Sequence, residues 1–124
     1  MPAPKRILVT ETKDTLSLEY DQQRFNLSAE YLRVFSPSAE VRGHGQGQQV
    51  LQVGKKNVTI ETVVRSGNYA IQLVFSDGHD SGIYSWDYLF DLGTNFNSNW
   101  SDYLERLHQA GKTREAEAQV VKLL

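Results

Sequence analysis

The residues of this chain that could do chemistry are concentrated in one short segment, from Asp77 to Trp86. His79 lies there between two carboxylates, Asp77 and Asp80. An imidazole titrates near neutral pH, so it can bind a metal ion or transfer a proton, and neighbouring carboxylates could assist. A structural interpretation competes with this, because Asp and His side chains in turns often hydrogen-bond the backbone of the turn. We favour the structural interpretation, because a metal site needs several convergent ligands and the segment offers one good ligand, His79.

The same segment contains the residue types of a serine hydrolase. Ser81 or Ser85 would be the nucleophile, His79 the base, and Asp77 the acid that orients it. The sequence lacks the Gly-x-Ser-x-Gly motif of a nucleophile elbow, and residues this close together in a turn do not automatically adopt triad geometry. We therefore expect no catalytic residues, and we expect that the chain is not an enzyme.

Aromatic side chains follow the histidine at short intervals. Large aromatic residues near the start of a helix usually pack against a sheet, so we expect Trp86 and Leu89 in the core. Tyr84 and Tyr88 are expected to be partly exposed and to offer a contact surface. The candidate binding surface consists of Asp77, His79, Asp80, Tyr84 and Tyr88.

The elements that must position this segment are mostly strands, because apolar and polar residues alternate over much of the chain. The first three alternating runs are separated by short polar turns and predict an antiparallel meander. Gly67 can supply the positive φ of a hairpin turn. The alternate residues from Val58 to Val64, and those from Tyr69 to Phe75, are each expected on one face of this hairpin. The predicted strands cover residues 7–10, 16–20, 25–27, 58–64, 69–75 and 81–84.

Cap and stop signals predict helices between and after these strands. Each starts after a residue whose side chain can accept a hydrogen bond from the first turn. Gly93 and Gly111 are expected beyond the ends of the second and third helices, and the fourth is expected over Arg114–Leu124. The expected caps are Ser28, Ser85, Ser98 or Asn99, and Thr113. The fold class is therefore α+β, a small, mainly antiparallel β-sheet with short helices, followed by C-terminal helices.

Three alternating glycines lie between Gly43 and Gln49. Glycine loses much backbone entropy when it is ordered, so we expect an exposed, mobile loop there. A phosphate-binding loop would need a strand before it, a helix after it and further spacing that this segment lacks.

Composition narrows the class of protein. The chain has 124 residues, 40% of them hydrophobic and 23% charged, which fits one globular domain. A net charge of −2 gives no reason to expect nucleic-acid binding. There is no cysteine, so disulfides and thiolate metal ligation are excluded. No long apolar run follows Met1, so we expect neither a signal peptide nor a membrane span, and we expect a cytoplasmic protein.

Several separated motifs together resemble the N-terminal domain of the gamma-butyrobetaine hydroxylase family, a small domain long catalogued as of unknown function. The motifs are Ala29–Arg33, Ser36–Glu40, Gly67–Ala70 and Phe75–Trp86. The resemblance extends from about Ile7 to Gly93. We therefore predict this domain over residues 5–93, with residues 94–124 as a C-terminal helical extension.

The resemblance implies something about metal. In the eukaryotic hydroxylases this domain binds a structural zinc through three cysteines and one histidine. His79 would be the counterpart of the histidine, and Ser36, Ser38 and Val41 would stand in place of the cysteines. Serine hydroxyls are poor zinc ligands and valine is none. We therefore expect that the zinc site is lost and that no cofactor is bound, with zinc or iron at His79 as the alternative.

The resemblance also implies what kind of role to expect. In the hydroxylases the domain precedes a separate oxygenase domain, and related domains are attached to P-loop iron–sulfur carrier proteins. The favoured hypothesis is a non-catalytic accessory or protein-binding module. The alternative is a metal-binding accessory domain linked to an iron-dependent oxygenase or to iron–sulfur cluster assembly. Either way the expected partner is another protein, with an iron–sulfur carrier and an oxygenase as the two candidates.

Overall fold

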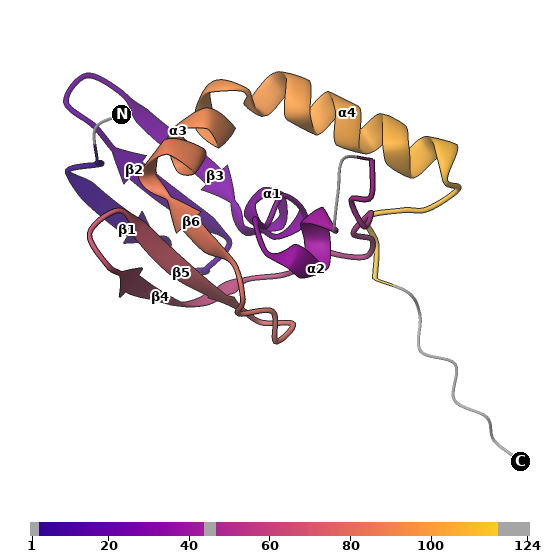
Figure 1. Cartoon of the computed structure of the whole chain (residues 1–124), viewed down its shortest axis with the longest axis horizontal. Coiled ribbons are helices and arrows are strands. Elements are labelled where there is room, and N and C mark those ends of the chain that lie inside the picture. The colour runs from indigo at the N-terminus through magenta and orange to yellow at the C-terminus, as the bar shows by residue number, and fades with distance from the viewer. Residues whose placement is uncertain (1–2, 44–46, 117–124) are drawn as a thin grey trace, which may run out of the picture.

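The computed structural model of the chain describes residues 3–43 and 47–116, which form two small antiparallel sheets with short helices and a longer C-terminal helix (Figure 1). This confirms the predicted α+β class. In chain order the elements are β1 (Arg6–Val9), β2 (Thr15–Glu19), β3 (Arg24–Ser28), α1 (Ala29–Val34), α2 (Ala39–Arg42), β4 (Ile60–Ser66), β5 (Ala70–Phe75), β6 (Ile83–Ser85), α3 (Trp86–Thr94) and α4 (Phe96–Gln109).

The first sheet is the predicted meander, with the strand order β1-β2-β3. Leu16 and Leu18 of the central strand β2 are fully buried, and they pair with Leu27 and Phe25 of β3. The two-residue alternation of this segment thus places its apolar side chains on one covered face, as the sequence pattern indicates.

The second sheet has the order β4-β5-β6 and contains the predicted hairpin, with Gly67 at φ 64° in its turn. A bulge between Ile60 and Thr62 reverses the alternation along β4. Ile60 is therefore buried while Thr62 and Val64 are exposed, so the prediction of one shared face from Val58 to Val64 is wrong.

The return strand β5 buries Ile71, Leu73 and Phe75, as the alternation predicts. Tyr69 does not share their environment, since it precedes the strand at the tip of the hairpin and is 77% exposed. The inner face of this sheet and that of the first sheet contribute to one hydrophobic core.

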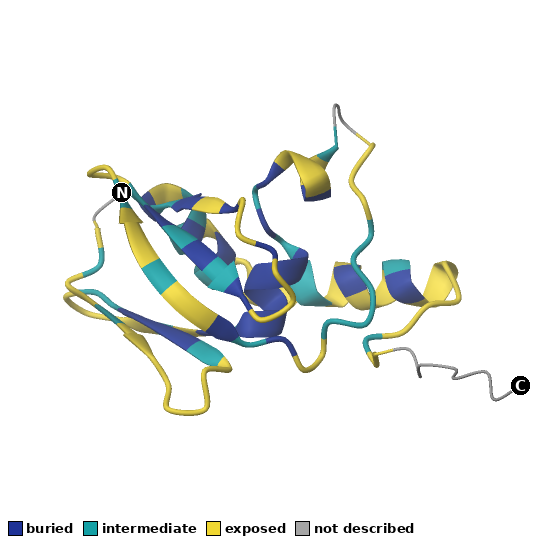
Figure 2. Cartoon of the chain, turned by 90° about the horizontal axis from the view of Figure 1, so that it is seen from below, coloured by how far each residue is buried: buried dark blue, intermediate teal, exposed yellow. Residues whose placement is uncertain are grey.

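Helix α1 lies in the middle of the molecule, between the sheets and α4, and all its residues are buried (Figures 1 and 2). Ser28 caps it as predicted, because its hydroxyl accepts a hydrogen bond of 3.0 Å from the backbone N–H of Tyr31. Ser85 caps α3 in the same way, through the backbone N–H of Tyr88 at 3.1 Å. Two of the predicted caps are thereby confirmed.

Gly93 was expected beyond the end of its helix, but it lies inside α3. A Cβ atom at this position would be 2.4 Å from the ring of Phe25 on β3. Glycine is therefore present because the helix packs closely on the sheet. Helix α4 then begins at Phe96, earlier than the expected caps Ser98 and Asn99, and makes no side-chain cap hydrogen bond.

The chain turns after α4 at Gly111, with φ 66°, and residues 112–116 form neither a helix nor a strand. The backbone N–H groups of Gly54 and Lys56 donate to the carbonyl oxygens of Thr113 and Arg114, each at 3.0 Å. The expected helix from Arg114 is therefore wrong for residues 114–116, while residues 117–124 lie outside the described part of the chain.

The segment that follows α1 contains the short helix α2, which was not predicted from the sequence. Of the expected loop at residues 43–49, residues 47–49 are exposed and residues 44–46 lie outside the described ranges. Within the described ranges, no helix combines the length and apolar character needed to cross a membrane.

Candidate functional site

The segment from Asp77 to Trp86 starts as a tight turn between β5 and β6. The backbone N–H of Phe75 donates to the carbonyl of His79 at 2.9 Å, and Gly78 adopts φ 88°. One carboxylate oxygen of Asp77 accepts a hydrogen bond of 3.2 Å from the backbone N–H of His79. Asp77 thus stabilises the backbone of its own turn, as the structural interpretation predicts for this residue.

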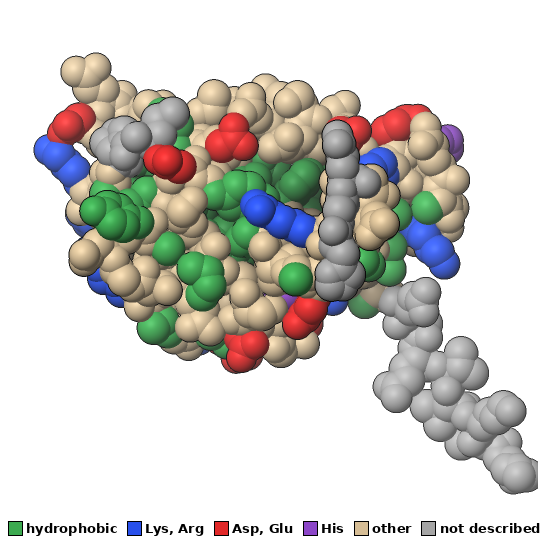
Figure 3. Space-filling model, in the orientation of Figure 1, with side chains coloured by type: hydrophobic (Ala, Val, Ile, Leu, Met, Phe, Trp, Pro, Cys, Tyr) green, Lys and Arg blue, Asp and Glu red, His purple; other side chains and the backbone are tan. Residues whose placement is uncertain are grey.

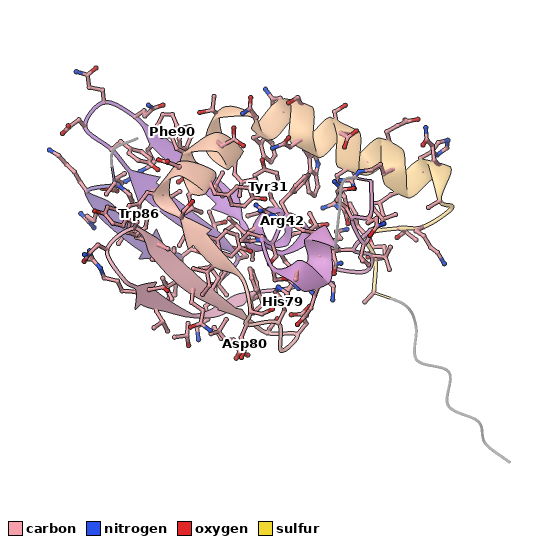
Figure 4. The ribbon with its side chains drawn as sticks, viewed as in Figure 1. Tyr31, Arg42, His79, Asp80, Trp86 and Phe90 are labelled. Carbon is pink, nitrogen blue, oxygen red and sulfur yellow. The ribbon has the colours of Figure 1, made fainter. Side chains whose placement is uncertain are left out.

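The His79 side chain is directed away from its turn, toward the connection between α1 and α2 (Figure 4). His79 is 7% exposed, and its Nε2 atom lies 2.8 Å from Ser36 Oγ and 3.4 Å from Ser38 Oγ. On the other side of the ring, Nδ1 lies 3.4 Å from a carboxylate oxygen of Glu40. We call these four residues the His79 cluster.

Burial lowers the pKa of His79, and the positive charge of nearby Arg33 lowers it further. A neutral ring is therefore favoured. With its proton on Nδ1, the ring directs an N–H toward the Glu40 carboxylate. Its Nε2 atom then accepts a hydrogen bond from the Ser36 hydroxyl. Both ring nitrogens are then matched within the His79 cluster, which gives the imidazole a structural role.

Gly82 allows the His79 cluster to form. A Cβ atom at this position would lie 2.6 Å from Ser36 Oγ and 2.9 Å from the ring of Tyr84. Distances this short exclude a side chain unless the neighbours move. The glycine therefore lets the start of β6 approach the serine that holds His79.

The Asp77 carboxylate is bound by two cations. Arg33 Nε lies 2.9 Å and Lys55 Nζ 2.7 Å from the same oxygen. Burial alone would raise the pKa of Asp77, but hydrogen bonds from Lys55 and from the backbone N–H of His79, with Arg33 alongside, lower it to about 2. Asp77 thus joins α1 to the segment before β4 and is not a free surface carboxylate.

The remaining predicted residues do not form one surface. Asp80 is exposed. Tyr84 is fully buried, and its hydroxyl donates to the carbonyl of Leu32 at 2.6 Å, so the expected partial exposure is wrong. The register Ile71–Tyr84 places this side chain on the inner face of the sheet. Tyr88 is half-buried and donates to the carbonyl of Phe35 at 2.5 Å.

A groove of about 610 Å³ lies between α2, residues 49–52 and α4, and we call it the α2–α4 groove. Figure 3 shows hydrophobic side chains in a hollow between α4 and α2, with a basic side chain across it. The aliphatic and aromatic residues that line the groove are Val34, Phe35, Val41, Val50, Leu51, Tyr88 and Tyr103.

Charged side chains border this apolar surface. Arg42, which extends from the end of α2, holds its guanidinium 4.9 Å from the centre of the Tyr88 ring (Figure 4). Arg106 Nε lies 3.1 Å from a carboxylate oxygen of Asp102, one turn earlier on α4. Among residues 3–43 and 47–116, no carboxylate forms an ion pair with Arg42. The groove therefore presents a cation beside apolar side chains.

The family to which the chain belongs follows from its similarity to a known family model. The family model described as "Gamma-butyrobetaine hydroxylase-like, N-terminal" matches residues 7–90. The chain belongs to this family. No curated protein matches it.

Solved structures of similar chains share the fold of this gamma-butyrobetaine hydroxylase-like domain. Two solution NMR structures are 48% and 44% identical, with TM-scores of 0.83 and 0.78. Both matches cover 100% of this chain, and they cover 98% and 94% of the other chains. A crystal structure of a protein of unknown function from Acidithiobacillus ferrooxidans is 35% identical with a TM-score of 0.60, covering 73% of this chain and 91% of that one.

The zinc site of the eukaryotic hydroxylases, to which the resemblance points, does not fit the residues present here. The fold does bring Ser36, Ser38 and His79 together, as the resemblance implies. Yet two of these offer neutral hydroxyls, and the buried Val41 offers no donor atom. In the described part of this domain, no three His, Cys, Asp or Glu residues are grouped as metal ligands would be. The His79 cluster is thus a hydrogen-bonded contact whose side chains are poor ligands for zinc.

Sequence reasoning missed the α2–α4 groove in this domain almost completely. Of the five predicted site residues, Tyr88 alone is among those that line it. The groove forms where α1, α2, residues 49–52 and α4 meet, so its residues are scattered between Val34 and Arg106. Ordinary apolar residues and arginines at such separations carry no recognisable motif.

Proposed function

We propose that this gamma-butyrobetaine hydroxylase-like domain is a non-catalytic accessory module that binds another protein in the α2–α4 groove. The observation that carries the proposal is the groove itself, which combines an open apolar surface with the guanidinium of Arg42, whose charge no described carboxylate neutralises. Concave apolar surfaces with a few polar groups are the usual form of a binding site. Exposed apolar residues in such a surface, among them Val50 at 52% exposure, are stabilised when a partner covers them.

The residues that line the groove support binding more than turnover. They include no histidine, and their one carboxylate, Asp102, is engaged by Arg106. The buried imidazole of His79 is occupied by Ser36 and Glu40 and is not part of the groove lining. A general acid or base must reach the proton that it transfers. The Tyr88 and Tyr103 hydroxyls of the lining are likewise engaged, because they donate to the backbone carbonyls of Phe35 and Gln52.

The identity of the partner follows the family resemblance. We propose an iron–sulfur carrier or an oxygenase, in the cytoplasm, as the first partners to test. The alternative role, in which the domain itself carries a metal, finds poor ligands in the His79 cluster. Metal analysis of the purified protein and of His79→Ala tests it, and a stoichiometric metal that is lost in the variant would overturn the non-metal role.

Site-specific photo-crosslinking tests the binding role. The photoreactive residue p-benzoylphenylalanine is placed at Val50 in the groove, or at Tyr69 at the tip of the distant β4–β5 hairpin. We expect a discrete protein adduct from position 50 and none from position 69, with the adduct identified by mass spectrometry. Adducts that form equally at both positions, or at position 69 alone, would show that the groove is not the binding site.

A matched pair of charge insertions controls this experiment. Leu51→Asp puts a carboxylate into the apolar lining of the groove, whereas Val64→Asp makes the same change on exposed β4. We expect the position-50 adduct to disappear in Leu51→Asp and to persist in Val64→Asp. Circular dichroism and thermal unfolding of both variants establish that each is folded.

A further inference from the structure

The α2–α4 groove carries information about the chemistry of its occupant. Arg42 lies at one side of it, with the central carbon of its guanidinium over the ring of Tyr88, 4.9 Å from the ring centre. A guanidinium has five N–H donors, so Arg42 can interact with the Tyr88 side chain and still donate to a carboxylate. The described residues supply no such carboxylate, so this site is complementary to an anion from outside.

The second cation of the groove is paired within the groove, so the net positive charge of the lining comes from Arg42. Arg106 shares the groove with Asp102, and the two side chains balance each other's charge at 3.1 Å. The lining as a whole contains two arginines and one aspartate, and therefore has a net charge of +1. The whole chain has a net charge of −2, so the positive groove is a local feature and not a consequence of overall composition.

The apolar lining indicates the second property of the ligand, an apolar side chain. Phe35, Val41, Leu51 and Tyr103 come from different segments and converge on one space of about 610 Å³. That volume falls within the range of about 300–1,000 Å³ typical of pockets that hold a small ligand. It accommodates a few side chains of a partner and not a folded surface.

We infer that the α2–α4 groove recognises a short acidic segment of the partner protein, in which a carboxylate lies next to a large aliphatic or aromatic side chain. The carboxylate binds Arg42, and the apolar side chain packs against the half-buried Phe35 and Leu51 and the exposed Val50. This inference rests on the proposed function, and it adds to it the chemical class of the bound segment.

The test is an NMR titration of the isotope-labelled full chain with matched capped peptides. The probes are acetyl-Glu-Leu-Glu-Leu-amide, its Gln-Leu-Gln-Leu counterpart, its Glu-Ser-Glu-Ser counterpart, and octanoate as a small apolar carboxylate. We expect the first peptide to shift the resonances of Leu51 and Tyr103, and to bind roughly tenfold more tightly than either counterpart. Equal binding of the Glu-Leu and Gln-Leu peptides would overturn the inference, as would stronger binding of octanoate than of any peptide.

Two arginine variants complete the design. Arg42→Gln should lower the affinity for the acidic peptide to that for the Gln-Leu peptide, whereas Arg65→Gln, on exposed β4, should leave it unchanged. Unchanged acidic-peptide affinity in Arg42→Gln would also overturn the inference. If the position-50 adduct forms while the peptides do not discriminate, the ligand chemistry alone is wrong. If neither the adduct nor any peptide shift is seen, the proposed function fails as well.

Discussion

The connection from α1 to α2 separates two regions that use their polar groups in opposite ways. On one side, Ser36 and Ser38 enclose the buried imidazole of His79. On the other side, Val41 and Arg42 border the open α2–α4 groove. The first region satisfies its polar atoms internally, and the second leaves a guanidinium and apolar side chains available.

This difference shows that the residue types best suited to catalysis or metal binding are not the ones that are available to a ligand. A histidine beside carboxylates in a sequence suggests catalysis or metal binding. Here burial and polar contacts give His79 a structural role. The groove is built from residue types that attract no notice, such as Val41 and Leu51. If the two regions differ in this way, substitutions in the His79 cluster should affect mainly stability, and substitutions in the groove should affect mainly binding.

The largest expected effect is on stability, and it separates the two regions directly. His79→Ala leaves a cavity and removes the partner of the buried Ser36 hydroxyl, so we expect a loss of about 2–4 kcal/mol of unfolding free energy. Arg42→Ala, at an exposed site, should change it by less than about 0.5 kcal/mol. Urea unfolding measures both, with exposed Asp80→Ala as the neighbouring control. Comparable losses in His79→Ala and Arg42→Ala would remove the contrast.

A second prediction concerns the close approach of β6 to the His79 cluster. Gly82→Ala should destabilise the fold by about 1–3 kcal/mol, because its Cβ would lie 2.6 Å from Ser36 Oγ. In a Ser36→Ala background this contact disappears and only the one with Tyr84 remains, so the additional loss should be smaller. The four proteins of this double-mutant cycle are compared by urea unfolding. Strictly additive losses would mean that the serine does not limit the space at Gly82.

Local features of this fold could be predicted from the sequence, and features that depend on distant contacts could not. The caps Ser28 and Ser85 act within one turn of their helices, so their residue type was sufficient. Gly93 was misread as a helix stop because its partner, Phe25, is remote in sequence. The non-helical course at Arg114 was missed for the same reason, since Arg114 pairs with the buried Glu30 of α1 through two hydrogen bonds of 2.7 Å.

The candidate site divides along the same line. The turn around Asp77 could be predicted, because its hydrogen bond to the backbone is local. The family resemblance further placed Ser36, Ser38 and His79 together, which periodicity alone could not do. The burial of Tyr84 follows from its register with Ile71 across the sheet, and the groove follows from the packing of α4. Neither can be read from one segment of sequence.

A third prediction uses pH to separate the His79 cluster from the carboxylate network beside it. Because the folded pKa of His79 is lowered, its contribution to stability is complete above its unfolded value of about 6.5 and declines as the pH falls below that. Asp77, with a pKa of about 2, contributes above its ordinary value of 3.8. That contribution, about 1–2 kcal/mol after allowance for solvent, is lost as the pH falls from about 4 to 2.

Unfolding free energies across this pH range, for the native chain and two variants, measure the two contributions. His79→Gln should abolish the decline that starts near pH 6.5, and Asp77→Asn should abolish the one below about pH 4. Each variant serves as the control for the other, because it should remove the decline in its own pH range and leave the other decline unchanged. A decline near pH 6.5 that persists in His79→Gln would show that another group is responsible.

The smallest expected effect concerns the ion pair between Asp102 and Arg106 in the groove. Asp102→Asn removes the negative charge beside Arg106 while keeping the shape of the side chain, and an exposed pair of this kind contributes less than about 0.5 kcal/mol to stability. An acidic peptide should then bind a few-fold more tightly, because both arginines of the groove become available to its carboxylates. Glu105→Gln, also exposed on α4 but not among the lining residues, is the matched control and should leave affinity unchanged. An equal gain in both variants would point to the overall charge of the chain, whereas a gain confined to Asp102→Asn locates the recognition of anions within the groove.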